Sequence, residues 1–240
     1  MKVSEIFQQL TYGELKQYGI GGFDEKGVSE DDYPELTSHL NLALLKIYTR
    51  FPILERELVL VPIFEKTMYE INSSNTFSSG NPDWFIQDTA EMPFTDDIVR
   101  MSTVFDQYGN EVPINDENAD FSVFTPKHNT LQIPMNVSGS LAVIYRAKPD
   151  TLVAPTEDDD EATFAAFLDT DVVVPEVLVE ALFAYVEYRV AKSMGGESGL
   201  VQATAAKDLF ERLCVEVEKQ NLLNTTVTPT DLKPEIRGFV

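Results

Sequence analysis

The sequence has very few of the residues that bind transition metals or form disulfides. Its 240 residues include one cysteine, Cys214, and two histidines, His39 and His128. A single cysteine excludes an intramolecular disulfide, and a structural zinc site needs four ligands that are mostly cysteine and histidine. Apolar residues surround Cys214 at helical spacing, so we expect a buried and inert thiol. These features are typical of a protein that folds in a reducing cytoplasm.

Positive charge and long apolar runs are also scarce. The chain has 18 Lys and Arg residues against 40 Asp and Glu residues, which gives a net charge of -22. This surplus repels the phosphates of DNA and of anionic membranes, so we expect no DNA-gripping surface and no membrane partner. No apolar run approaches the roughly 20 residues that span a bilayer, and segment 1–10 lacks the apolar middle of a signal peptide. We therefore expect a soluble protein whose mature form starts at Met1.

Motifs for nucleotide binding and nucleophilic catalysis are missing as well. The glycines of Gly19–Gly22 follow a predicted helix, whereas a phosphate-binding loop opens one, so this segment is interpreted as a linker turn. No serine lies in a nucleophile elbow, and His128 lies among ordinary loop residues. In so acidic a chain carboxylate pairs carry little information, and we expect Asp96-Asp97 and Asp116-Glu117 on exposed loops. The sequence predicts no catalytic residue and no cofactor.

One segment has the spacing of a calcium-binding loop but lacks its other parts. Asp116, Asn118 and Asp120 alternate as calcium ligands do, yet Phe121 takes the place of the glycine and Lys127 that of the distal glutamate. The acidic run Glu157–Glu161 is most simply a solvated connector. We therefore predict no metal site.

The N-terminal part predicts helices. Ser4 can cap a short helix, and Thr11 with Glu14 has the spacing of a capping box for a second helix that stops at the Gly19–Gly22 turn. A long amphipathic helix is expected from Ser29 to about Pro52, with His39 as a half-exposed residue on it. Its apolar positions are Leu36, Leu40, Leu44, Ile47 and Phe51.

The middle of the chain predicts short antiparallel strands. Runs of alternating or β-branched residues occur at 58–61, 98–105, 131–133 and 141–145. Residues 108–110 and 137–140 are predicted to be hairpin turns. Trp84-Phe85-Ile86 is interpreted as core packing at the edge of this β region rather than as a stacking platform for sugars or bases. The pattern favours a small sandwich or barrel.

Helical periodicity returns near the C-terminus. A helix is expected from Pro175, with Leu178, Leu182, Tyr185 and Val186 on one face. Met194-Gly195-Gly196 should break it, and a final helix should run from about Ser198 to Leu222. Its recurring apolar positions are Ala206, Leu209, Phe210, Leu213 and Val217. These two helices predict a helical hairpin.

The predicted architecture is α+β. Residues 1–54 and 151–223 form a helical bundle because neither flank has enough apolar surface alone, and residues 55–150 are an inserted antiparallel β-sandwich or barrel-like domain. Residues 224–240 form an extended C-terminal arm that includes two large apolar residues, Phe239 and Val240. From the residues, a docking arm and a frayed end remain equally open.

Several short segments resemble one family of virion proteins. They are Leu10–Leu15, Asp32–Leu36, Asn41-Leu42, Leu44, Tyr48–Phe51, Val104–Asp106, Asn115–Asn118, Phe124–Pro126, Asn129–Leu131, Ile144–Ala147 and Gly238–Val240. They are similar to segments of bacteriophage head-to-tail adaptor (connector) proteins, and the similarity spans essentially the whole chain. None of these segments carries a chemical motif.

The resemblance implies a structural, non-enzymatic subunit of a dodecameric ring between the portal and the tail. The helical part would lie near the capsid and the β insertion would face tail components. The arm, with Leu232, Pro234, Ile236, Phe239 and Val240, would dock on the portal. The implied partners are the portal protein, a tail or nozzle protein, further copies of the chain and DNA in transit. The implied location is the head-tail junction of the virion, after assembly in the host cytoplasm. An acidic lumen would keep passing DNA from sticking.

Two other functions fit parts of the sequence. A net charge of -22 is large enough for an inhibitor that mimics DNA, although its acids should then line one face in paired rows. The aromatics of the β region also suit a carbohydrate-binding module, or a carbohydrate-active enzyme.

Overall fold

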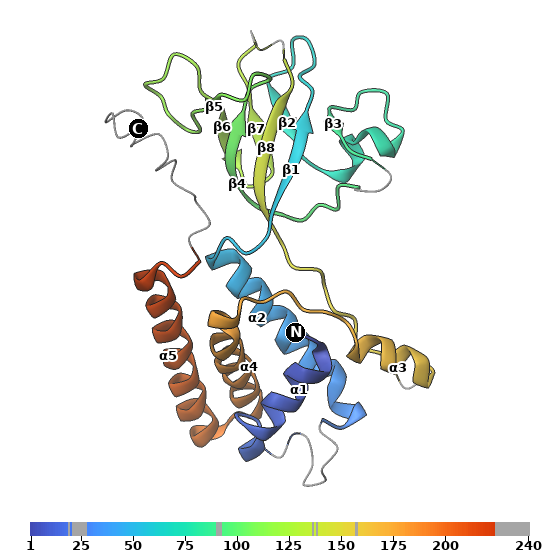
Figure 1. The fold of residues 1–240 in the computed structure, drawn as a ribbon, viewed down its shortest axis with the longest axis vertical. Helices are drawn as coiled ribbons and strands as arrows, with labels where there is room; N and C mark the ends of the chain where they lie inside the picture. The colour runs from blue at the N-terminus through green and yellow to red at the C-terminus, as the bar shows by residue number, and fades with distance from the viewer. Residues whose placement is uncertain are drawn as a thin grey trace, which may run out of the picture. The chain divides into compact units, whose positions relative to one another are not determined.

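The computed structural model describes residues 1–18, 20, 28–89, 93–135, 137, 139–156 and 158–223 (Figure 1). The fold is α+β, as predicted. The chain divides into two compact units, which we call the helical unit, Met1–Ala43 with Leu152–Val240, and the β-rich unit, Leu44–Thr151. N-terminal helices and a C-terminal helical pair therefore belong to one unit, and the two antiparallel sheets belong to the other.

The N-terminal segment contains helix α1 (Val3–Tyr12), short 3-10 turns η1 (Lys16–Tyr18) and η2 (Glu30–Asp32), and helix α2 (Tyr33–Arg50). The long predicted helix is confirmed as α2, which ends just before Pro52. All of its predicted apolar positions are buried. The division between the two units falls within this helix, after Ala43.

Two predictions for the first helices are wrong. Helix α1 begins before Ser4, and Lys2 is its N-cap, with the Lys2 backbone N–H donating to Glu5 at 2.8 Å. Thr11 lies inside α1, where its hydroxyl donates to the Phe7 carbonyl at 2.7 Å instead of capping a new helix. Among residues 13–18, the 3-10 turn η1 takes the place of the predicted second helix. Most of the Gly19–Gly22 segment lies outside the described residues.

The β-rich unit contains two sheets. The first has the order β3-β1-β8-β4-β5, and the second has the order β2-β7-β6. Their bounds are β1 Glu55–Leu60, β2 Met68–Glu70, β3 Ile86–Gln87, β4 Ile98–Phe105, β5 Glu111–Val112, β6 Phe124–Lys127, β7 Thr130–Gln132 and β8 Leu141–Ala147, with 3-10 turns η3 Ser73–Asn75 and η4 Phe77–Ser79. Both sheets contribute to one hydrophobic core. Because β3 and β5 end the first sheet without meeting, the barrel prediction is wrong.

One of the two predicted hairpins is confirmed. Strands β4 and β5 pair antiparallel, with Val104 opposite Val112, and Gly109 in the connecting turn has a φ of 82°. The predicted hairpin at residues 137–140 is wrong, because β7 pairs with β2 and β6 whereas β8 pairs with β1 and β4. This connection leads from one sheet to the other.

The C-terminal segment contains α3 (Glu161–Leu168), the 3-10 turn η5 (Glu176–Leu178), α4 (Val179–Met194) and α5 (Gly196–Gln220). The break at Gly195-Gly196 is confirmed, since both glycines have positive φ, and α4 and α5 form the predicted hairpin (Figure 1). Helix α3 was not predicted. Asp160, near the end of the acidic run that was interpreted as a solvated connector, is the N-cap of α3, and its carboxylate accepts from the Thr163 N–H at 2.8 Å.

The N-terminal helices and the C-terminal helical pair pack together, as predicted. Gln17 and the Tyr18 hydroxyl both donate to the Glu187 carboxylate, at 2.9 and 3.1 Å. Burial, followed by the charge of Glu187, raises the pKa of Tyr18 to about 12. Near α2, the Ser193 hydroxyl donates to Glu35 at 3.2 Å.

Burial of individual residues both confirms and corrects the sequence analysis. Cys214 is fully buried, as expected. His39 is not half-exposed but buried, at 7% exposure, because helical phase places it on the same side of α2 as the apolar stripe. Across the described part of the chain, no helix has both the length and the apolar character needed to cross a bilayer.

Candidate functional site

A groove lies beside strand β1 in the β-rich unit. Its volume is about 770 Å³, which is in the range of small-ligand and peptide sites. Its lining residues are Arg56, Glu57, Leu58, Val59, Ile86, Gln87, Asp88, Thr89, Pro93, Phe94, Thr95, Tyr145 and Asp150. They come from β1, from β3 and the two residues after it, from β8 and the segment after it, and from the segment that leads into β4.

The groove exists because β3 is much shorter than β1. Strand β8 pairs with β1 along its whole length, from Glu55 to Leu60, whereas β3 pairs only with Val59 and Leu60. After Gln87 the chain leaves the sheet at Asp88. The Asp88 carboxylate accepts from the Ser78 N–H at 2.9 Å and from the Ser78 hydroxyl at 2.6 Å, which fixes this departure. The first half of β1 is therefore bordered by β8 on one side and by the groove on the other.

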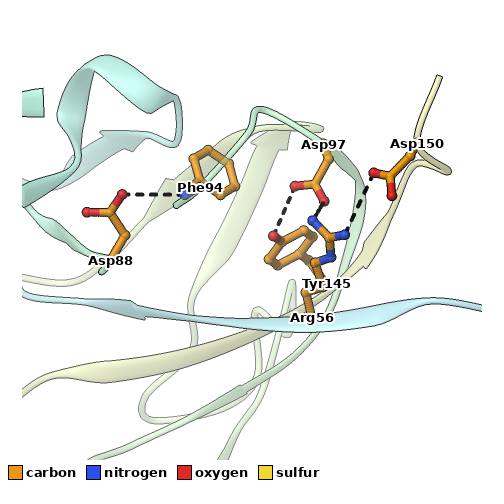
Figure 2. A network of polar contacts seen from close by, with 6 residues as sticks. All are labelled: Arg56, Asp88, Phe94, Asp97, Tyr145 and Asp150. Atoms are coloured by element: carbon orange, nitrogen blue, oxygen red, sulfur yellow. Dashed lines mark hydrogen bonds and ion pairs between the residues drawn. The ribbon is translucent and has the colours of Figure 1, made fainter. Parts of the chain in front are cut away.

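A network of charged and polar groups joins three residues that line the groove, Arg56, Tyr145 and Asp150, through Asp97 (Figure 2). The Arg56 guanidinium donates to the Asp97 carboxylate at 2.8 Å, and the Tyr145 hydroxyl donates to the other oxygen of Asp97 at 3.0 Å. A second Arg56 nitrogen lies 4.0 Å from Asp150, whose side chain is 96% exposed. The strand register places Arg56 directly opposite Tyr145, so two neighbouring strands and the residue before β4 supply the network.

Burial controls the protonation of this network. Burial, followed by the nearby charge of Asp97, raises the pKa of Tyr145 far above its usual range. The hydroxyl therefore stays protonated and donates a hydrogen bond to Asp97. Burial alone would raise the pKa of Asp88, but hydrogen bonds from Ser78 and from the Phe94 N–H outweigh it and lower that pKa. The Asp88 carboxylate is therefore charged at neutral pH.

The contacts around Asp97 fix the positions of the side chains of Arg56 and Tyr145. Both oxygens of Asp97 accept hydrogen bonds, and the Phe94 ring packs edge-on against Tyr145 with centroids 6.0 Å apart. Leu58, Ile86 and Phe94, which lie along the groove, are buried in the core, while the acidic residues Glu57, Asp88 and Asp150 also line it. Among the described residues, no group of three or more His, Cys, Asp or Glu side chains is arranged to hold a metal ion.

The sequence analysis placed only part of this site correctly. Asp97 was expected on an exposed loop with Asp96, and that expectation is wrong for Asp97, which is 8% exposed. It immediately precedes β4, whose pairing with β8 brings it beside Arg56 and Tyr145. A signal was available, because Arg56 has the same strand phase as the buried Leu58 and Leu60 and therefore needs an inward counter-charge.

Other predicted positions lie apart from the groove or outside the described residues. Asp116 and Glu117 are exposed as expected, and Asp116 accepts from the Asn118 N–H at 2.9 Å in a local turn. Phe85 and Ile86 are buried, which confirms core packing, while Trp84 packs edge-on against Phe77. All five arm residues, Leu232, Pro234, Ile236, Phe239 and Val240, lie outside the described residues.

In comparisons with known proteins, no protein-family model and no curated protein matches this chain.

Proposed function

We propose that this chain is a structural, non-catalytic virion subunit, a head-to-tail adaptor that forms a ring between a bacteriophage portal and its tail. The observation that carries the proposal is the layout of the chain. Both of its ends build one helical unit, and the β-rich unit is inserted between them, which is the arrangement that the sequence resemblance implies. Since both sheets share one core, we further propose that they are the two layers of a small sandwich.

The helical unit offers a surface for contacts between ring subunits. Leu200, Val201 and Val215 lie on α5 and are 59%, 66% and 36% exposed. Val201 and Val215 lie on the side of α5 opposite its buried residues Phe210 and Cys214, and Leu200 lies at the border of that side. Exposed aliphatic side chains of this kind are available for contacts with a neighbouring subunit. In a ring each copy would present this face to a different face of its neighbour.

The charge of the chain suits DNA passage. A ring multiplies the net charge of -22 by its copy number, so a lumen with this composition repels the DNA backbone. DNA would then pass without sticking. In this proposal the arm residues 224–240 reach the portal, and the β-rich unit meets a tail or nozzle protein.

The two other functions receive less support. Described acids act locally: Asp160 caps α3, Asp106 accepts from Tyr108 and Asn110 in the β4–β5 turn, and Asp97 is buried. A DNA mimic would instead present its acids in rows on one face. For carbohydrate, Phe77 is 58% exposed, but its edge-on packing against Trp84 gives no flat two-ring platform.

Negative-stain electron microscopy tests the proposal. The purified chain, alone and mixed with its portal protein, is expected to form rings that stack on the portal. A chain truncated after Leu223 should lose portal binding, because it lacks the arm, and should still form rings. A chain that stays monomeric and does not bind the portal would contradict the adaptor function. Binding to sugars in a glycan array would favour the carbohydrate-binding module.

A further inference from the structure

We propose that the outer face of the first sheet binds a segment of a partner protein that carries acidic side chains followed by apolar ones. The outer face is the side of β1, β8 and β4 that points away from the shared core. The observation behind the proposal is a row of basic side chains, Arg100, Arg146 and Lys148, that makes no ion pair within the described part of this acidic chain. The inference goes beyond the ring function, since it concerns the β-rich unit alone and holds whether or not the chain forms a ring.

Strand register decides which side chains lie on the outer face. Burial alternates along β8, where Tyr145 and Ala147 are buried whereas Ile144 and Arg146 are partly exposed. Successive residues of a strand point to opposite faces of the sheet, so Ile144 and Arg146 lie on the outer face. Strand β4 runs beside β8 (Figure 1), and its Arg100 is paired with Arg146 in the ladder. Arg100 therefore lies on the outer face as well.

Lys148 extends the basic row beyond the end of β8. The Lys148 N–H donates to the Asp97 carbonyl at 2.7 Å, just before β4, so the pairing of the two segments continues past Ala147. The alternation then places Lys148 on the outer face, two positions from Arg146, which is a separation of about 6–7 Å along the strand. Lys148 and Arg100 are both exposed. Three basic side chains therefore gather at one end of the outer face.

The charges of this row are not compensated within the described residues. None of the three side chains makes an ion pair or a hydrogen bond there, and the Arg146 Nε is buried without a hydrogen-bond partner. Like charges directly opposite each other on neighbouring strands are destabilising, and a buried unpaired donor costs free energy. A carboxylate held between Arg100 and Arg146 would relieve both, because a guanidinium can donate two parallel hydrogen bonds to one carboxylate.

Two acids also lie on the outer face, but on β1. Glu55 pairs with Arg146 in the ladder and Glu57 with Ile144. Among the described residues no ion pair joins Glu55 to Arg146. Strand β8 separates β1 from β4, so Arg100 lies two strands, or about 10 Å, from the β1 acids. The positive side of the outer face is therefore at β4 and the end of β8, and opposite charge selects an acidic partner there.

Apolar side chains continue the outer face away from the basic row. Two positions before Arg146 lies Ile144, and two before that lies Ala142, which pairs with Val59 of β1 and with Phe105 of β4. These apolar residues are partly exposed. A segment that runs along β8 would place a carboxylate at the basic row and apolar side chains here, where burial adds to binding. A free anion such as phosphate would use the basic row alone, so this composition favours a protein segment.

A solvated sheet surface is the alternative explanation. An antiparallel sheet often has one face in water, and the basic row would then hold no ligand. This alternative makes the opposite prediction for charged peptides, because a net charge of -22 repels acidic ligands and attracts basic ones. DNA is disfavoured for the same reason, since its phosphates extend beyond the basic row. A preference for an acidic peptide is therefore a specific sign of the proposed site.

Synthetic hexapeptides provide the probe for the test. The full chain is titrated by calorimetry with acetyl-EESITV-amide, whose second glutamate, isoleucine and valine share one side of an extended chain, at the spacing of Arg146, Ile144 and Ala142. It should bind about tenfold more tightly than acetyl-QQSITV-amide or acetyl-KKSITV-amide, because these lack the carboxylates that the arginines would hold. Acetyl-EESSTS-amide should bind several-fold more weakly than acetyl-EESITV-amide, because it lacks the apolar side chains.

Double variants locate the binding on the outer face. Arg100→Gln with Arg146→Gln should abolish the preference for the glutamate peptide over the glutamine peptide, and Arg100→Glu with Arg146→Glu should turn it into a preference for the lysine peptide. Lys127→Gln with Lys207→Gln is the matched control. It changes the net charge as the first variant does, at exposed positions on β6 and α5, and should keep the preference. If the glutamate variant does not fold, the glutamine variant makes the distinction.

Several results would overturn the proposal. They are equal binding of the glutamate and glutamine peptides, a preference of the unmodified chain for the lysine peptide, and a preference for glutamate that persists in Arg100→Gln with Arg146→Gln. A DNA duplex or inorganic phosphate that bound as tightly as acetyl-EESITV-amide would also contradict it. Self-association that is lost in the same glutamine variant, without peptide binding, would assign the outer face to a second copy of the chain instead.

Discussion

The two units bury polar side chains in different ways. In the β-rich unit, Asp97 is buried with both carboxylate oxygens satisfied, one by Arg56 and one by Tyr145. In the helical unit, His39 is buried while neither ring nitrogen makes a hydrogen bond within the described part of the chain. Its Nε2 lies 3.4 Å from Glu35, which is within reach of an ion pair but too long and too poorly aligned for a good hydrogen bond.

This difference indicates where each unit is sensitive. A satisfied network is strongly coupled, so removing one member leaves its partners without compensation. An unsatisfied buried imidazole is already unfavourable, and the addition of a proton makes it more so. The β-rich unit should therefore be sensitive to mutation of its polar core, and the helical unit should be sensitive to pH.

The largest effects should come from a matched pair of aromatic residues, one in each unit. Phe85 packs edge-on against Tyr69 at 5.1 Å in the β-rich unit, and Phe210 packs edge-on against Tyr185 at 5.0 Å in the helical unit. Both are fully buried. Phe85→Ala and Phe210→Ala should each lower the free energy of unfolding by about 3–5 kcal/mol, because each leaves a cavity.

Urea unfolding can assign each of these losses to its unit. The single tryptophan, Trp84, lies in the β-rich unit, so its fluorescence reports on that unit, while far-ultraviolet circular dichroism mainly follows the helices. Phe85→Ala should shift the fluorescence transition and Phe210→Ala the dichroism transition. If either variant shifted both transitions equally, the two units would unfold as one and the comparison between them would fail.

The next largest effect should come from Asp97. Asp97→Ala leaves the buried Tyr145 hydroxyl without an acceptor and leaves Arg56 only the exposed Asp150 at 4.0 Å, and should lower the free energy of unfolding by about 1–3 kcal/mol. The loss should appear in the Trp84 fluorescence transition. Asp150→Ala is the matched control, because it also faces Arg56 but at 4.0 Å and with a 96% exposed side chain, and it should change stability very little. Equal effects of the two variants would show that the network does not stabilise the core.

The helical unit follows from local patterns more directly than the β-rich unit does. Apolar residues at helical spacing predict α2 and the α4–α5 hairpin, because the residues that pack together lie three or four positions apart. Helix α3 was missed because it has only eight residues and depends on distant contacts. Phe167 packs against Phe7 at 6.2 Å and against Tyr33 at 6.0 Å, and nothing near Phe167 in the sequence indicates these partners.

The groove could not be predicted from the sequence for a related reason. It depends on where β3 stops, and Asp88 stops it by accepting hydrogen bonds from Ser78, which is ten positions away. It also depends on the register between β1 and β8, which joins residues far apart along the chain. Arg56 was the one residue that indicated this site, because it has the same strand phase as the buried Leu58 and Leu60. That phase predicts an acidic partner on the core side, but the sequence does not indicate which acid it is.

A smaller effect should appear when the pH is lowered. Burial lowers the pKa of His39, and Arg189 adds to this, while Glu35 opposes it. The folded state therefore binds a proton less readily than the unfolded state, whose histidine titrates near pH 6.5. Stability from this residue is present above that pH and is lost as the pH falls below it, with a slope of at most about 1.4 kcal/mol per pH unit for one proton.

Comparison with His39→Gln isolates this effect from the many carboxylates that also titrate in acid. Urea unfolding of both proteins between neutral and mildly acidic pH, followed by circular dichroism, should give a shallower loss of stability for the variant. His128→Gln is the control, because His128 is exposed, and it should keep the slope of the unmodified chain. A variant His39→Gln with that same slope would contradict the buried, unsatisfied imidazole as the source of acid sensitivity.

The smallest effect should come from the cap of α3, which tests whether a polar contact at the surface of the helical unit behaves like a buried one. Asp160 accepts from the Thr163 N–H and hydroxyl, and these bonds lower the pKa of Asp160. Asp160→Ala should raise the hydrogen-exchange rates of α3 amides several-fold, because Thr163 loses its acceptor. The neighbouring Asp158→Ala should leave them unchanged, since its side chain makes no hydrogen bond to α3 among the described residues. Because these hydrogen bonds depress the folded pKa of Asp160, the contribution of the cap is complete above the ordinary aspartate pKa and is lost as the pH falls from there through the lower folded pKa. Protection that persisted in Asp160→Ala would show that Phe167 and its aromatic partners hold α3 without a cap.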